Sequence, residues 1–91
     1  MQVKTKSGFK CDINEHVLED WRFTKAVAKA HSDNDSDRMM AAVDLVSLVL
    51  RDNEDAYYDY VASKNNGIVS EDTVTKDLTS IIEQIKALKN S

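Results

Sequence analysis

The sequence predicts a small α+β domain that is mostly α-helical, with an N-terminal β-hairpin packed on a bundle of about four helices. Three observations indicate this class. The chain contains no proline and only two glycines, so few turns interrupt it. Its first residues alternate between apolar and polar types, whereas later segments carry apolar residues at helical spacing. A length of 91 residues fits a single domain, residues 1–91.

Residues 1–13 are expected to form the hairpin. A two-residue Ser7-Gly8 loop would place lysines on the same face of the hairpin as its apolar residues. A three-residue loop instead pairs Val3 with Cys11 and puts Gly8 at the left-handed position of a bulged turn, so that all apolar residues share one face. Because an isolated two-stranded hairpin is marginally stable in water, this face must lie on the helices.

Capping residues give the limits of the four expected helices. The predicted ranges are residues 15–31, 36–51, 54–64 and 71–90. The candidate N-caps, in the same order, are Asn14, Ser36 or Asp35, Asn53, and Ser70 or Asp72. Gly67 suits the left-handed position that ends the third helix.

The first helix is expected to carry two apolar faces. At 100° per residue, one face holds Val17, Leu18, Trp21 and Ala28, and the opposite face holds Phe23, Ala26, Val27 and Ala30. The second helix is apolar almost all round from Met39 to Leu50, which is typical of a buried, central core helix. Either all these faces pack into one core, or some remain free for a partner.

The fourth helix carries a narrow apolar stripe. Its members are Val74, Leu78, Ile81, Ile85 and Leu88, and Ile82 widens it on one side. The stripe spans just over two heptads, which is too short to predict a coiled coil by itself.

No catalytic, cofactor or metal site is predicted, and we expect a protein that is not an enzyme. Asp33, Asp35 and Asp37 have the spacing of a calcium loop, but Arg38 occupies the position where such a loop needs glycine. Cys11 points toward the apolar side of the hairpin, which favours a buried structural thiol over a nucleophile.

The charge distribution disfavours a general nucleic-acid-binding protein. Twelve basic and sixteen acidic residues give a net charge of −4, whereas phosphate backbones require a basic surface. Residues 31–60 hold eight acids against Arg38 and Arg51. No N-terminal segment resembles a signal peptide or a membrane span, so the expected location is the cytoplasm.

Several motifs together resemble one family. They are the segment Leu18-Glu19-Asp20-Trp21 after the hairpin, Leu48-Val49-Leu50-Arg51 at the end of the apolar helix, an acidic and aromatic third helix, and Asn66-Gly67-Ile68-Val69-Ser70 before the last helix. In this order they resemble the small tail assembly chaperones of long-tailed phages and prophages of Gram-positive bacteria. A proline that often follows the glycine turn in that family is absent here.

The resemblance implies a chaperone in the host cytoplasm that binds the phage tape measure protein, keeps it soluble and helps tail tube subunits assemble around it. A homo-oligomer is expected, without nucleic-acid or membrane partners. Helix geometry alone nominates the protein-binding residues, which are Phe23, Val27, Ala30, Tyr58, Ile82 and Leu88. Replacing Phe23 and Val27 by serine is then expected to weaken association with little loss of helicity.

Two other functions stay open. An acidic inhibitor that mimics DNA would use an array of carboxylates, and its binding to a basic enzyme should collapse with salt. Its residues would be Asp33, Asp35, Asp37, Asp52, Glu54, Asp55 and Asp59. A structural head or tail-completion protein would instead remain in the finished virion.

Overall fold

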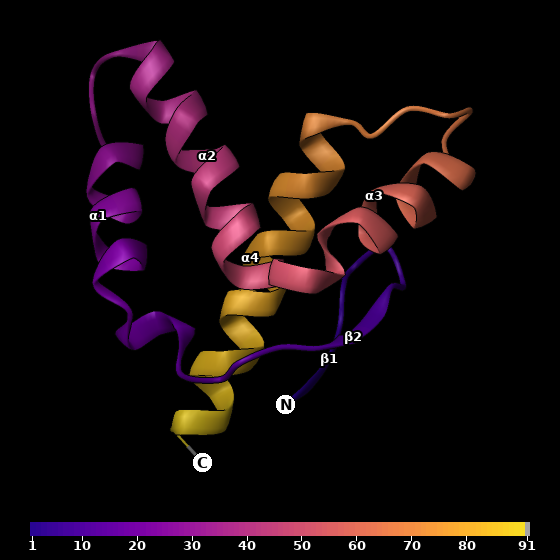
Figure 1. Ribbon diagram of the computed structural model, residues 1–91, viewed down its shortest axis with the longest axis horizontal. Coiled ribbons are helices and arrows are strands. Elements are labelled where there is room, and N and C mark those ends of the chain that lie inside the picture. Colours follow the sequence, from indigo (N-terminus) through magenta and orange to yellow (C-terminus); the bar gives the residue numbers. More distant parts are fainter. Residues whose placement is uncertain (91) are drawn as a thin grey trace.

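The computed structural model describes residues 1–90 and has mostly α-helical structure with one small antiparallel sheet (Figure 1). The elements are β1 (Gln2–Lys4), β2 (Lys10–Asp12), the 3₁₀ turn η1 (Val17–Glu19), α1 (Trp21–Ala30), α2 (Asp35–Leu50), the 3₁₀ turn η2 (Arg51–Asn53), α3 (Glu54–Ser63) and α4 (Glu71–Lys89). The predicted fold class is therefore confirmed. In Figure 1, α1 and α2 form a helical hairpin on one side, α3 lies on the other, and α4 runs between them.

The N-terminal hairpin has the predicted register. Val3 pairs with Cys11, and the Thr5 amide donates a hydrogen bond of 2.8 Å to the Phe9 carbonyl across the turn. Gly8 has a φ of +107°, a conformation that side chains disfavour. Val3, Cys11 and Ile13 are buried on one face, as parity requires.

The first helix begins later than the sequence predicts. Asn14 accepts a hydrogen bond from the His16 amide and caps only a short turn, after which Asp20 adopts an extended conformation. Asp20 then caps α1 by accepting a 2.8 Å hydrogen bond from the amide of Arg22. The predicted range 15–31 was wrong at its start because two capping side chains lie close together and the second one begins the helix.

This break changes which side of α1 is buried. Val17 is buried in the core, but Trp21, predicted to lie beside it, is 76% exposed. Residues before and after Asp20 no longer share one helical phase, so the predicted face containing both was wrong. Ala26 is buried instead, and Phe23 packs against the core.

The second helix is buried mainly toward its C-terminal end, and Ala41 is the one buried residue before Leu45. Asn34 caps it, one residue before the predicted candidates. Leu45, Val46, Val49 and Leu50 are buried. Met39, Met40 and Val43 are 64%, 53% and 53% exposed, so the prediction of a fully buried core helix was wrong for these three residues. The N-terminal part of α2 lies beside α1 and away from the β-hairpin, where fewer elements are present to cover it (Figure 1).

The last two helices largely match their predicted ranges. Ser70 caps α4 by accepting a hydrogen bond of 3.2 Å from the Thr73 amide, and Gly67, with a φ of +81°, follows the end of α3 as predicted. Asn53 was predicted to cap α3 but makes no cap hydrogen bond. Its side chain donates instead to the Asp12 carbonyl at 2.7 Å, which ties the start of α3 to the hairpin.

A buried carboxyl group joins three parts of the molecule. Asp77 of α4 is 2% exposed. It accepts hydrogen bonds from the Ser7 amide at 2.8 Å, the Ser7 hydroxyl at 2.6 Å and the Tyr57 hydroxyl at 2.6 Å. The hairpin turn and α3 are thereby oriented on α4, because a buried acceptor is favourable only with its donors in place.

Candidate protein-binding surfaces

Exposed apolar side chains concentrate on α2. Three of the six large apolar residues that are well exposed lie within residues 39–43, close to the N-terminus of this helix. The six are Trp21, Met39, Met40, Val43, Ile68 and Leu88. Single exposed apolar residues are common on proteins, but a cluster marks an interaction surface.

Part of this cluster borders a hollow that we call the apolar groove. It lies between α2 and the start of α4 and has a volume of about 670 Å³. Its lining residues are Asp35, Arg38, Met39, Ala42, Val43, Val46, Tyr58, Val69, Glu71, Val74 and Thr75. The α2 members recur at helical spacing, so they present one face of this helix to the groove. The charged residues among them lie in the first turns of α2 and α4, and the rest of the lining is mainly apolar.

Tyr58 provides an aromatic wall for the apolar groove. Its hydroxyl donates a 2.6 Å hydrogen bond to a carboxylate oxygen of Glu54. Burial, that hydrogen bond and the nearby charges of Glu54 and Asp55 raise the pKa of Tyr58 to about 12. The side chain is therefore neutral near pH 7, and its hydroxyl already has an acceptor within the chain.

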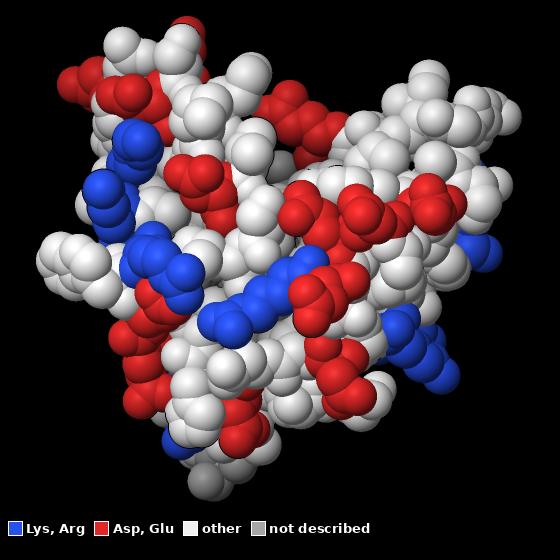
Figure 2. Space-filling view, viewed as in Figure 1, with Lys and Arg blue, Asp and Glu red and all other residues white. Residues whose placement is uncertain are grey.

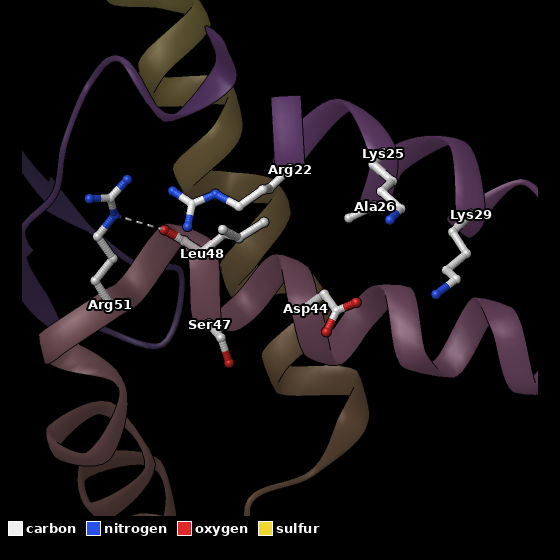
Figure 3. Close-up of a pocket in the computed structure, with 8 residues that line it drawn as sticks. All are labelled: Arg22, Lys25, Ala26, Lys29, Asp44, Ser47, Leu48 and Arg51. Carbon is white, nitrogen blue, oxygen red and sulfur yellow. Dashed lines mark hydrogen bonds between the residues drawn. The ribbon is translucent and has the colours of Figure 1, made fainter. Parts of the chain in front are cut away.

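A second hollow, which we call the basic groove, lies between α1 and α2 (Figure 3) and has a volume of about 540 Å³. Its lining residues are Arg22, Lys25, Ala26, Lys29, Asp44, Ser47, Leu48 and Arg51. In Figure 3, Lys29 reaches from α1 toward α2, and Asp44 points into the same space. Four cationic side chains therefore line this groove, although the net charge of the whole chain is negative.

The two arginines of the basic groove have partners within the chain. Arg22 makes a bidentate contact with Asp20, with N···O distances of 3.0 and 2.6 Å. Hydrogen bonds from the side chain and amide of Arg22 lower the pKa of Asp20 to about 2. Arg51 lies 4.0 Å from the same carboxylate and donates to the Leu48 carbonyl at 3.3 Å.

Arg51 also has an unusual backbone conformation. Its φ of +50° with a ψ of −120° is strongly disfavoured for a residue with a side chain. This residue ends α2 and begins η2, the turn that redirects the chain into α3. The strained residue therefore lies at the point where the basic groove meets the acidic third helix.

The structure separates the predicted binding residues from one another. Phe23, Val27 and Ala30 are half-buried on α1, which packs against α2, and Ile82 is half-buried on α4. Leu88 is exposed near the end of α4. Of the six nominated residues, Tyr58 alone lines the apolar groove.

Met39 and Val43 are the groove residues that sequence reasoning missed. A helix that is apolar all round is predicted to be buried, and that pattern does not distinguish these two residues from their neighbours. A more informative signal is the pair of methionines in the first turns after the polar segment 31–37. Methionine is flexible and common at surfaces that bind varied partners.

Other candidate chemistry has a structural explanation. Burial is the main cause that raises the pKa of the Cys11 thiol, which keeps it protonated near neutral pH. Asp35 of the calcium-like loop is already in the first turn of α2 and pairs with Arg38. Among residues 1–90, no three His, Cys, Asp or Glu side chains lie close enough to hold a metal ion. In the same part of the chain, no helix has the length and apolar character needed to cross a membrane.

Comparisons of the chain with protein-family models, with curated proteins and with solved structures found no match.

Proposed function

We propose that this protein is a non-enzymatic binding protein that takes an amphipathic helix of a larger protein into the apolar groove. The observation that carries the proposal is the exposure of Met39 and Val43 along a groove with a mainly apolar lining. A protein that needed no partner would gain stability by covering these side chains, since buried apolar area contributes roughly 25 cal/mol per Å².

The shape of the apolar groove favours a helix as the occupant. α2 supplies residues 35, 38, 39, 42, 43 and 46, a helical repeat along one wall, and the first turns of α4 supply part of the other. Grooves bounded by helices accept a further helix whose apolar residues recur at i, i+3, i+4 and i+7. Met39 can adjust its conformation to clients with different side chains.

The resemblance described above supports a particular client and setting. We propose that the client is the tape measure protein of a long-tailed phage or prophage, and that the protein acts in the cytoplasm of the bacterial host as a tail assembly chaperone. A tape measure protein is long, helical and prone to aggregation, so it offers many apolar helix faces. The net charge of −4 would help to keep the complex soluble.

A DNA-mimicking inhibitor receives less support from the distribution of charge. The acids it would use lie in two separate groups, around the start of α2 and along η2 and α3. Basic side chains are exposed on the same face as both groups (Figure 2). An array that imitates a phosphate backbone would have to be continuous.

Co-expression with the tape measure protein of a long-tailed phage tests the proposal. The wild-type chain should raise the soluble yield of the client and remain bound to it at about 0.5 M salt, where the Debye length is only about 4 Å. The double variant Met39→Ser with Val43→Ser should lose both effects while keeping its helical circular dichroism.

Trp21→Ser is the matched control, because Trp21 is 76% exposed and lies outside the apolar groove. It should solubilise the client as the wild type does. Equal solubilisation by the groove variant would contradict the proposal. Recovery of the chain in purified virions would instead favour a structural tail or head protein.

A further inference from the structure

Two pairs of like charges are placed at the same spacing on different helices. Lys25 and Lys29 are four residues apart on α1, and Asp55 and Asp59 are four residues apart on α3. Like charges at this spacing are neighbours on a helix surface and destabilise it. Within residues 1–90, none of these four side chains forms an ion pair. Neither pair therefore has an ion-pair partner among the residues that the structure describes.

The two pairs belong to charged regions that face the same way. Figure 2 shows blue side chains over α1 and the end of α2, and red side chains over α3, side by side on one broad face. Arg22 and Arg51 are already held by Asp20, so the cations left available in the basic groove are the two lysines. Asp44 is the one acid lining that groove, and it pairs with neither lysine.

A positive and a negative stripe side by side on one face are complementary to the same face of a second molecule. A twofold rotation about an axis lying between the stripes brings each positive stripe over the negative stripe of the other copy. Twofold interfaces of this kind require a self-complementary surface. In such a dimer the positive stripe of each copy faces the negative stripe of the other, so the same contact forms twice.

The molecule also has room for such an interface. Its principal extents are 35 × 33 × 19 Å, and Figures 1 and 2 look onto the broad side of this slab. Stable interfaces bury roughly 800 Å² on each partner, which is less than the area of that side. Leu48, a partly buried apolar side chain of the basic groove, would add contact area beneath the charges.

We propose that two copies of this chain associate through this broad face, with Lys25 and Lys29 of each copy against Asp55 and Asp59 of the other. The interface is distinct from the apolar groove and needs no client. Its formation is therefore measured on the purified chain alone, and its failure would leave the proposed client binding untouched.

Sedimentation equilibrium at about 20 mM and about 0.5 M salt provides the first test. The expected result is a dimer at low salt whose dissociation constant rises at least tenfold at high salt, because exposed charges are screened. A monomer at both salt concentrations and at about 100 μM protein would overturn the proposal, and so would an assembly larger than a dimer.

Charge reversal gives the sharper test. Lys25→Glu with Lys29→Glu, and separately Asp55→Lys with Asp59→Lys, should each produce monomers. The two double variants mixed together should form a heterodimer, because both contacts again join opposite charges, one with its original signs and the other with the signs reversed. All four substitutions in one chain should restore the homodimer at the original net charge.

Matched controls reverse exposed charges outside the two stripes. Lys6→Glu with Lys10→Glu alters the net charge as the first variant does, and Asp33→Lys with Glu83→Lys alters it as the second does. Both controls should dimerise as the wild type does. If they dissociate equally, or if the mixture of the two stripe variants remains monomeric, the proposed pairing is wrong.

Discussion

Two regions of the molecule differ in an unexpected direction: one buries a polar group and the other exposes apolar groups. Around Asp77, where the hairpin, α3 and α4 meet, a carboxyl group is buried with all its donors in place. Around the apolar groove, Met39 and Val43 are left largely in water although they belong to the most apolar helix. The difference indicates that the Asp77 region holds the fold together, whereas the side chains of the groove region are left accessible, as the proposed client binding requires.

Aromatic packing strengthens the Asp77 region. The ring of Phe9 lies 5.5 Å from the rings of both Tyr57 and Tyr60, and the Tyr60 hydroxyl donates to the Ser7 carbonyl. Gln84 of α4 exchanges hydrogen bonds with the backbone of Lys4 and so satisfies part of the edge of β1. No comparable polar contacts close the apolar groove among its lining residues apart from the Asp35–Arg38 pair, in the part of the chain that the structure describes.

The largest expected effect comes from removing the buried carboxyl group. Asp77→Ala should lower the free energy of unfolding by about 4 kcal/mol, because it leaves the buried Tyr57 hydroxyl and the two partly buried donors of Ser7 without an acceptor. That is a large share of the roughly 5–10 kcal/mol expected for a small domain. Urea unfolding followed by circular dichroism at 222 nm measures it. Asp33→Asn, an exposed control outside the proposed dimer contact, should stay within about 0.5 kcal/mol of the wild type.

A second prediction compares the two faces of α1. Phe23→Ser with Val27→Ser should destabilise the protein by about 3 kcal/mol, because both side chains are half-buried on a helix packed against α2. Trp21→Ser with Ala28→Ser changes the exposed face and should cost under about 1 kcal/mol. The midpoint temperatures of thermal unfolding of the two double variants show which face of α1 contributes to the core. A larger loss for the variant at Trp21 and Ala28 would support the sequence-based expectation that the face with Phe23 and Val27 is free for a partner.

A third prediction uses two adjacent tyrosines. Tyr57→Phe removes one donor to Asp77 without changing the ring, and should cost about 2 kcal/mol. Tyr58→Phe removes a hydrogen bond to Glu54 at the rim of the apolar groove and should cost under about 1 kcal/mol. Chemical denaturation of both variants under the same conditions provides the comparison. Equal losses in the free energy of unfolding would mean that the hydrogen bond from Tyr57 to Asp77 stabilises the fold no more than the one from Tyr58 to Glu54.

The smallest effect concerns the ionisation of Tyr58. Its pKa of about 12 in the folded chain exceeds the ordinary value of 10.0, so its contribution to stability is complete below pH 10 and is lost as the pH rises toward 12. Absorbance at 295 nm should show this tyrosine titrating near pH 12. Glu54→Gln removes a nearby negative charge and should move the midpoint back toward 10. An unchanged midpoint would exclude the contribution of Glu54.

Local signals in the sequence were sufficient for much of the fold. Parity and Gly8 predicted the hairpin register, and Ser70 with the apolar stripe after it predicted α4. The start of α1 was missed because Asn14 and Asp20 both suit an N-cap, and only tertiary packing decides between them. The role of Asp77 was also missed, although an acid within the stripe formed by Val74, Leu78 and Ile81 indicates a buried polar contact.

The apolar groove was harder to predict than the fold. Periodicity identifies which residues of α2 are apolar, but not how far the neighbouring elements extend to cover them. Met39 and Val46 are equally apolar in type, yet one is 64% exposed and the other 4%. Exposure is a property of the assembled chain, so the apolar groove could be located only once the positions of α3 and α4 were known.

The most direct test of the central claim is methyl NMR on the three methionines of the chain. Met39 lines the apolar groove, whereas Met1 packs against the core beside the hairpin and serves as an internal reference. On titration with helical segments of the tape measure protein, the Met39 methyl resonance should shift and saturate while that of Met1 stays in place. An unchanged Met39 resonance, or equal shifts at Met1 and Met39, would contradict helix binding in the groove.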